Sequence, residues 1–207
     1  MKKELLDEIE FEITTLINSG FYKEDEILEI IEEQFIDEDF SLDSIEEIIS
    51  EKYSEKIASE EEWSKITDFD KLKDCFKDLT KEKIIAIHNA GYSLDEGIQD
   101  SFQVFYYLQD KKLKSEGFCF YHFQDIERAI ESNCIFLAFG DFENSEKKSL
   151  KIGKKIVNIL NKNGFTAIWN EDVNKRIKIK PFYWKKRCDN EEYELEGAVA
   201  LFLKYNS

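Results

Sequence analysis

Apolar residues recur every three or four positions through residues 1–62, and charged residues fill the positions between them. This spacing places the apolar side chains on one face of an α-helix. We predict three amphipathic helices. The first ends at Asn18-Ser19-Gly20, the second covers residues 24–35, and the third opens at Ser44, which has capping-box spacing to Glu47. Helices this short do not bury their apolar stripes alone, so they must pack against one another or against the rest of the chain.

From Trp63 onward, helical patterns alternate with short apolar runs that are typical of buried strands. A helix that ends at Asn163-Gly164 separates the last two of these runs. Beyond this region the alternation of charged and apolar residues over 176–180 indicates an exposed strand. The apolar stretch within 193–205 predicts a final strand. The predicted buried strands are 84–88, 118–122, 135–139 and 165–169.

These elements predict an α/β or α+β fold. An acidic helical N-terminal module (1–62) packs on a mixed sheet of about four to six strands with helices. The second part (63–207) is an alternating α/β domain that ends in a β-hairpin-like segment. Neither a repeat nor a low-complexity linker separates the two parts.

The charge of the chain is concentrated in the N-terminal module. Residues 1–62 contain 22 acidic and 5 basic side chains, a net charge of −17, whereas the remaining residues carry +1. Phosphate binding requires clustered lysine and arginine, so nucleic acid is disfavoured as a direct partner of this acidic face. A basic protein is favoured, because long-range attraction would steer it toward the module. The alternative is a solvated face that keeps the protein soluble.

Several classes of protein are disfavoured by composition. No apolar run approaches the roughly 18 residues of a membrane span, and the acidic start does not resemble a signal peptide. Four widely spaced cysteines form no C-x-x-C pair, so we expect reduced thiols in a cytoplasmic protein, with no metal site and no cofactor. Oligomeric state is not indicated.

The two histidines of the chain each follow a predicted strand. Ligands bind outside the carboxyl ends of parallel strands in open α/β sheets, so polar residues at such ends are candidate site residues. If the strands run parallel, two neutral imidazoles and one or two carboxylates would meet at one edge, where they could act as base and orienter or as ligands of a divalent metal. The alternative is that each histidine caps a strand end. The candidates are His88, Asn89, His122, Asp141 and Asn170.

A second group of polar residues surrounds His122. On a short helix near 124–132, Arg128 could form an ion pair with Asp125, one turn earlier, or with the adjacent Glu127. In a functional interpretation, Arg128 clamps an anion beside His122. In a structural interpretation, it belongs to a salt-bridged helix end.

Familiar catalytic motifs are absent from the sequence. There is no G-x-G-x-x-G or G-x-x-x-x-G-K loop, no G-x-S-x-G elbow and no H-E-x-x-H. One basic and aromatic run, residues 178–187, could meet the acidic helices within the molecule, bind an anion or form a partner interface.

Five stretches are similar to an uncharacterised bacterial family known as a domain of unknown function. The similarity extends from about residue 17 to about residue 180, and the string Tyr-His…Gln-Asp…Glu-Arg-Ala at 121–129 is its most specific part. Some relatives have a cysteine-rich segment where this chain has 88–93, which favours His122 over His88 as the chemical group. The resemblance implies no activity, substrate or cofactor. The stretches are SGFY at 19–22, TDFDKL at 67–72, HNAGY at 88–92, FYHFQDIERA at 120–129 and LAFG at 137–140, and WN at 169–170 lies near the end of the similarity.

Two functions remain open from the sequence. The first is a protein-binding or inhibitory module, similar in manner to a toxin-immunity protein, that engages a basic partner through its acidic face. The second is a small enzyme or ligand-binding domain with a strand-end pocket around His122. A shared cleft for His88 and His122 would favour the second.

Overall fold

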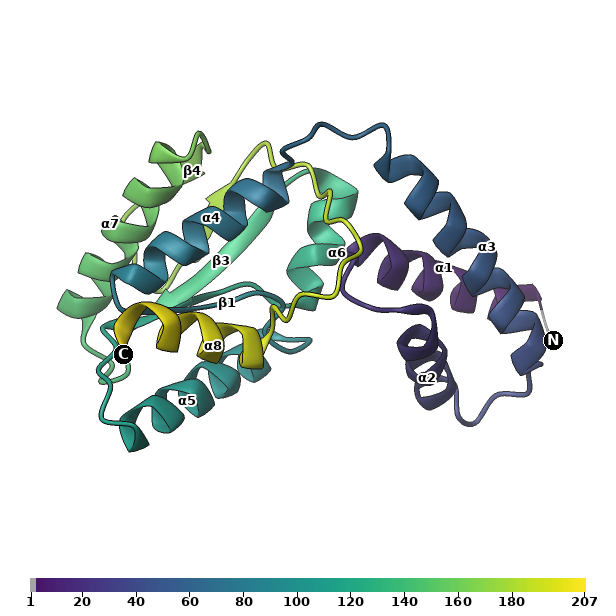
Figure 1. Cartoon of the computed structure of the whole chain (residues 1–207), viewed down its shortest axis with the longest axis horizontal. Coiled ribbons are helices and arrows are strands. Elements are labelled where there is room, and N and C mark those ends of the chain that lie inside the picture. Colours follow the sequence, from purple (N-terminus) through teal and green to yellow (C-terminus); the bar gives the residue numbers. More distant parts are fainter. Residues whose placement is uncertain (1–2) are drawn as a thin grey trace. The chain divides into compact units, whose positions relative to one another are not determined.

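The computed structural model describes residues 3–207, which form eight helices and a five-stranded mixed sheet. The prediction of an α+β fold with a mixed sheet is thus confirmed. The chain divides into two compact units, and both are visible in Figure 1. Unit 1 contains the residues up to Thr67 together with Lys185–Asn190, and unit 2 contains Asp68–Trp184 and Glu191–Ser207.

Unit 1 is built on three helices, α1 (Lys3–Ser19), α2 (Glu24–Gln34) and α3 (Leu42–Glu60). Each helix packs against the other two, and the isoleucines of their apolar stripes are fully buried between them. Gly20 ends α1 with a φ of 75°, a left-handed conformation that glycine adopts without strain. The three predicted helices are confirmed, but the predicted start of the third is wrong. Ser41, not Ser44, is the N-cap of α3.

The segment Lys185–Asn190 completes unit 1, although it follows most of unit 2 along the chain. Lys186 is 1% exposed, and its ammonium donates a hydrogen bond to the Gly20 carbonyl at 2.7 Å. Lys56 of α3 in turn donates to the Lys186 carbonyl at 2.8 Å. Three roles were open for the basic run 178–187. Lys186, which belongs to this run, contacts the acidic helices within the molecule, and this is the first of the three roles.

The sheet of unit 2 has the strand order β1-β2-β3-β5-β4. Only β1 and β2 are parallel, and every other neighbouring pair is antiparallel. The carboxyl ends of β1, β2 and β5 therefore lie at one edge of the sheet, and those of β3 and β4 lie at the opposite edge. The strands are β1 (Ile84–Ile87), β2 (Gly117–Phe120), β3 (Ile135–Gly140), β4 (Ala167–Ile168) and β5 (Ile177–Ile179).

Five helices surround this sheet (Figure 1). Buried side chains of β1 and β2 form one core with α5 and α8, and α4 and α7 also pack against the sheet. Gly97 allows α5 to approach β2 closely, because a Cβ at that position would lie 2.2 Å from the Phe120 ring. The helices are α4 (Asp68–Lys81), α5 (Leu94–Asp110), α6 (Phe123–Ser132), α7 (Glu146–Lys162) and α8 (Leu195–Asn206).

The prediction of a final strand within 193–205 is wrong, because this region forms helix α8. Its apolar run resembles a buried strand, yet Leu195, Ala198 and Phe202 also recur at helical spacing. These three side chains enter the core that α8 shares with β1 and α5. A short apolar run has no unique period, and packing against three neighbours selects the helix here.

Candidate functional site

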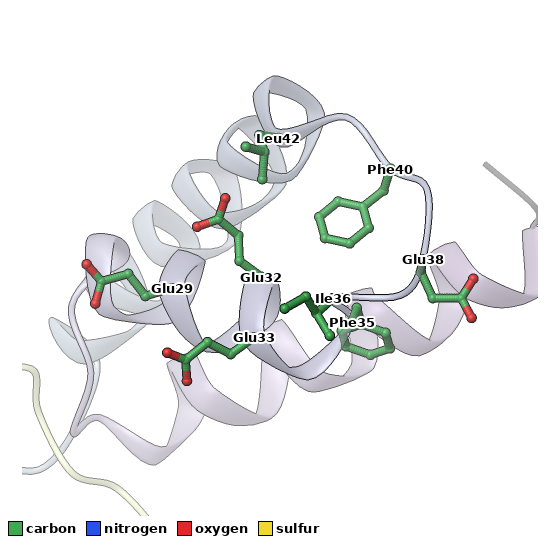
Figure 2. Close-up of a pocket in the computed structure, with 8 residues that line it drawn as sticks. All are labelled: Glu29, Glu32, Glu33, Phe35, Ile36, Glu38, Phe40 and Leu42. Carbon is green, nitrogen blue, oxygen red and sulfur yellow. The ribbon is translucent and has the colours of Figure 1, made fainter.

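An acidic pocket with apolar walls lies where α2 passes into α3 within unit 1. Its cavity volume is about 390 Å³. Figure 2 shows the Phe40 ring facing Glu32 and Leu42 across the opening. We refer to it as the acidic pocket. Its lining residues are Glu29, Glu32, Glu33, Phe35, Ile36, Glu38, Phe40 and Leu42.

The local fold explains why apolar side chains are exposed here. Phe35 follows the last turn of α2 and is 8% exposed, so it anchors the connection to the unit 1 core. The chain then turns away, which leaves Ile36 79% exposed and Leu42, at the first turn of α3, 42% exposed. Large apolar side chains beside a concave surface are typical of sites that bind another molecule.

The electrostatic character of the acidic pocket is uniformly negative. Four glutamates line it, and every charged residue from 24 to 43 is acidic. No basic side chain of this segment neutralises the field, so a cationic ligand would be attracted from a distance.

In unit 2, His122 belongs to a buried ionic network that we call the Asp125 cluster. It comprises His122, Asp125, Arg128 and Arg176. The Asp125 carboxylate is fully buried and accepts hydrogen bonds from Arg128 and Arg176, each at 2.9 Å. Nη1 of Arg176 also donates to Nε2 of His122 at 3.0 Å. The predicted ion pair between Arg128 and an acidic residue of its helix is thus present, with Asp125 as the partner.

The His122 imidazole is neutral at physiological pH. Burial and the neighbouring arginines lower the pKa of His122 to about 4. Nε2 lies within hydrogen-bonding distance of both Nη1 of Arg176 and the Asp125 carboxylate, whereas Nδ1 is buried and has no hydrogen-bond partner within the described residues. Because the imidazole is neutral, its contact of 3.1 Å with the Asp125 carboxylate is not an ion pair. With Nε2 engaged by these two groups, His122 is better suited to orient Arg176 than to accept a proton from a substrate.

His88 lies in a different environment. Its Nδ1 is 2.9 Å from the Tyr121 hydroxyl, and its ring stacks on Phe76 with centroids 4.3 Å apart. His88 is 5% exposed and lines a cavity of about 220 Å³ together with residues of α4 and α8. His122 is not among the lining residues of this cavity. Both imidazoles follow parallel strands, β1 and β2, yet their partners and surroundings differ.

The other sequence-predicted candidates are distributed over both edges of the sheet. Asn89 follows β1 and donates to Glu194, a carboxyl group whose pKa is raised by burial. Asp141 and Asn170 follow β3 and β4, whose carboxyl ends lie at the edge opposite to the histidines. Asp141 accepts hydrogen bonds from the Ser145 amide at 2.7 Å and the Ser149 hydroxyl at 3.1 Å, as a residue that shapes the turn before α7. A single edge that gathers all five residues would need parallel strands throughout, and β3 is antiparallel to β2.

Arg176 and the acidic pocket are absent from the sequence prediction. Arg176 is 54 positions from His122 along the chain, so no local motif links them. A signal does exist in the alternation over 176–180, because it places Arg176 and Lys178 on the same side of a strand. For the pocket, the signal is the apolar pair Phe35-Ile36 at the end of an otherwise amphipathic helix.

Two absences concern the described part of the chain. Within residues 3–207, no three or more histidine, cysteine or acidic side chains are grouped so that they could hold a metal ion. No helix in this range combines the length and apolar content that a membrane span requires.

Comparison with known proteins identifies one family. A model described as a domain of unknown function (DUF6891) matches residues 2–188. The resemblance to an uncharacterised family is thereby confirmed. No curated protein and no solved structure matches the chain.

Proposed function

Since this chain belongs to the DUF6891 family of domains of unknown function, we propose a function from its geometry: it binds a basic protein partner through the acidic pocket of unit 1. The observation that carries the proposal is the combination of four glutamates with exposed apolar side chains around one cavity. The partner segment that fits is cationic and presents at least one aliphatic or aromatic anchor. Neutralisation of that partner, in the manner of a toxin-immunity protein, is the specific role we infer.

Each part of the acidic pocket would contribute differently to binding. The glutamates would raise the association rate by attracting the cationic partner, and salt would screen this effect. The apolar residues would supply affinity by removing anchor surface from water. Ile36, 79% exposed, has the most surface to bury on binding.

We favour binding over catalysis because the two imidazoles do not combine into one site. The His122 ring faces Arg176 and Asp125, and the His88 ring is enclosed by aromatic rings that include Phe76 and Tyr121. The alternative, an enzyme or ligand-binding domain with a strand-end pocket around His122, would gain support from a cleft shared with His88, but His122 does not line the cavity that His88 lines.

A synthetic peptide with one leucine flanked by lysines and arginines tests the proposal. Fluorescence anisotropy should show saturable binding that weakens steeply as salt rises to roughly 0.3 M. The Ile36→Ser variant should bind about tenfold more weakly with an unchanged salt dependence, because it loses apolar contact only. Glu32→Gln combined with Glu33→Gln should weaken binding and also flatten the salt dependence.

Two controls distinguish the acidic pocket from general charge attraction. Glu55→Gln removes one charge from an exposed position of α3 that does not line the pocket, and it should leave binding nearly unchanged. A peptide in which serine replaces the leucine should bind poorly. Equal binding of both peptides, or equal loss in the Glu55 variant, would show that the module attracts cations without a defined site.

A further inference from the structure

Three cationic side chains from two strand positions and one helix converge on a single aromatic ring in unit 2. Their charged groups lie 5.1 to 5.5 Å from the centroid of the Phe136 ring. We call this group the Phe136 cation cluster. It consists of Arg128 on α6, Arg176 before β5 and Lys178 within β5.

Sheet register and helix spacing bring these residues together. Phe136 of β3 is directly opposite Lys178 of β5, so the two side chains share a face of the sheet. Arg176 precedes Lys178 by two positions and projects to that same face. On α6, Arg128 lies one turn after Asp125, which pairs with both arginines.

The cluster carries more positive charge than its surroundings neutralise. Asp125 offsets one of the three cations, and His122 is neutral, so the local excess is about two positive charges. Among residues 3–207, the Lys178 ammonium makes no hydrogen bond or ion pair with a side chain, and its contact is the Phe136 ring. The net negative charge of the chain is concentrated in residues 1–62, and the remaining residues, which include this cluster, carry a net charge of +1.

The hydrogen-bond donors of Arg176 differ in whether they have a buried acceptor. Its Nη1 serves both Asp125 and His122. Within the described chain, Nη2 and Nε donate no hydrogen bond to a buried acceptor of this kind. The Arg176 side chain is 29% exposed. Arg128 is similar, with Nη1 on Asp125 and 42% exposure. Two buried acceptors thus hold guanidinium groups on side chains that remain partly exposed to solvent.

We propose that the Phe136 cation cluster binds the phosphoryl group of a phosphate-bearing small molecule. A phosphate dianion matches the excess of charge, and its oxygens accept paired hydrogen bonds from planar guanidinium groups. Lys178 contributes a third positive charge, 5.5 Å from the centroid of the same ring. Asp125 and His122 are positioning residues, because they hold Arg176 through Nη1 and do not touch the anion.

Titration with inorganic phosphate tests this site. Amide NMR shifts of residues around 128 and 176–178 should change saturably with phosphate and not with chloride at the same ionic strength. Lys178→Met retains an apolar stem over Phe136 but removes the charge, and it should weaken phosphate binding about tenfold. The exposed Lys147→Met on α7 removes an equal charge and should not alter binding.

The outcomes separate a site from general ionic attraction. Circular dichroism should show that Lys178→Met is folded, since this side chain has no hydrogen-bonded partner. If that variant fails to fold, Arg128→Lys provides the second measurement, because it keeps the charge and loses the planar donor pair. Linear, chloride-like shifts, or unchanged affinity in a folded Lys178 variant, would overturn the proposal.

Discussion

Replacement of Asp125 by alanine is expected to lower the free energy of unfolding by about 3 kcal/mol. The carboxylate is fully buried and accepts hydrogen bonds from Arg128 and Arg176. Its loss would leave two guanidinium groups without their common counter-charge beside a neutral imidazole. Because both arginines keep some contact with water, the expected loss is at the lower end for a broken buried ion pair. Urea denaturation followed by circular dichroism measures it.

Glu131→Ala provides the matched control for this measurement. Glu131 lies on the same helix, is exposed and carries the same charge, so its replacement should change the unfolding free energy by less than about 0.5 kcal/mol. If Asp125→Ala cost no more than this control, the Asp125 cluster would not contribute to stability.

His122 is expected to lower the free energy of unfolding by about 2–3 kcal/mol as the pH decreases from 7 toward 4. The pKa of this imidazole is lowered from its ordinary value of 6.5 to about 4 in the folded protein. Between these two values, the unfolded chain binds a proton that the folded chain does not. Unfolding is therefore favoured increasingly as the pH falls through 6.5, and the effect levels off near 4.

The difference between the wild type and His122→Gln isolates this contribution. Glutamine does not titrate, yet its carbonyl oxygen can accept from Arg176. Groups that face the imidazole, including Asp125, Arg128 and Glu96, are present in both proteins. Urea denaturation at several pH values should give a shallower pH dependence for the variant. Parallel curves for the two proteins would contradict a neutral, buried His122.

Local patterns determine much of this fold. Helical periodicity correctly places the three helices of unit 1, and the N-cap of α5 is Ser93, whose hydroxyl accepts a hydrogen bond from the Glu96 amide three positions later. Strand β1 is also well predicted, since a continuous apolar run next to a glycine-containing turn leaves few alternatives. In each case the interactions that fix the element lie within a few residues of one another.

Strand direction and exposure do not follow from local patterns. Asp141 is separated from His122 because β3 runs antiparallel to β2, and that choice depends on how α6 packs against β3. Arg176 reaches Asp125 only after β5 has paired with β3, which is a long-range event. From the sequence, Ile36 would be assigned to the apolar stripe of a helix. In the structure the chain turns after Phe35, and Ile36 is exposed.

The place of Lys185–Asn190 within unit 1 affects the order in which the protein can fold during synthesis. The ribosome makes the three helices of this unit first, but the segment that supplies Lys186 emerges only after most of unit 2 has been made. The Gly20 carbonyl therefore has no Lys186 donor until the chain has grown by a further 166 residues. Unit 1 thus remains incomplete until residues 185–190 have been made, and a chain that stops at residue 67 would lack this segment.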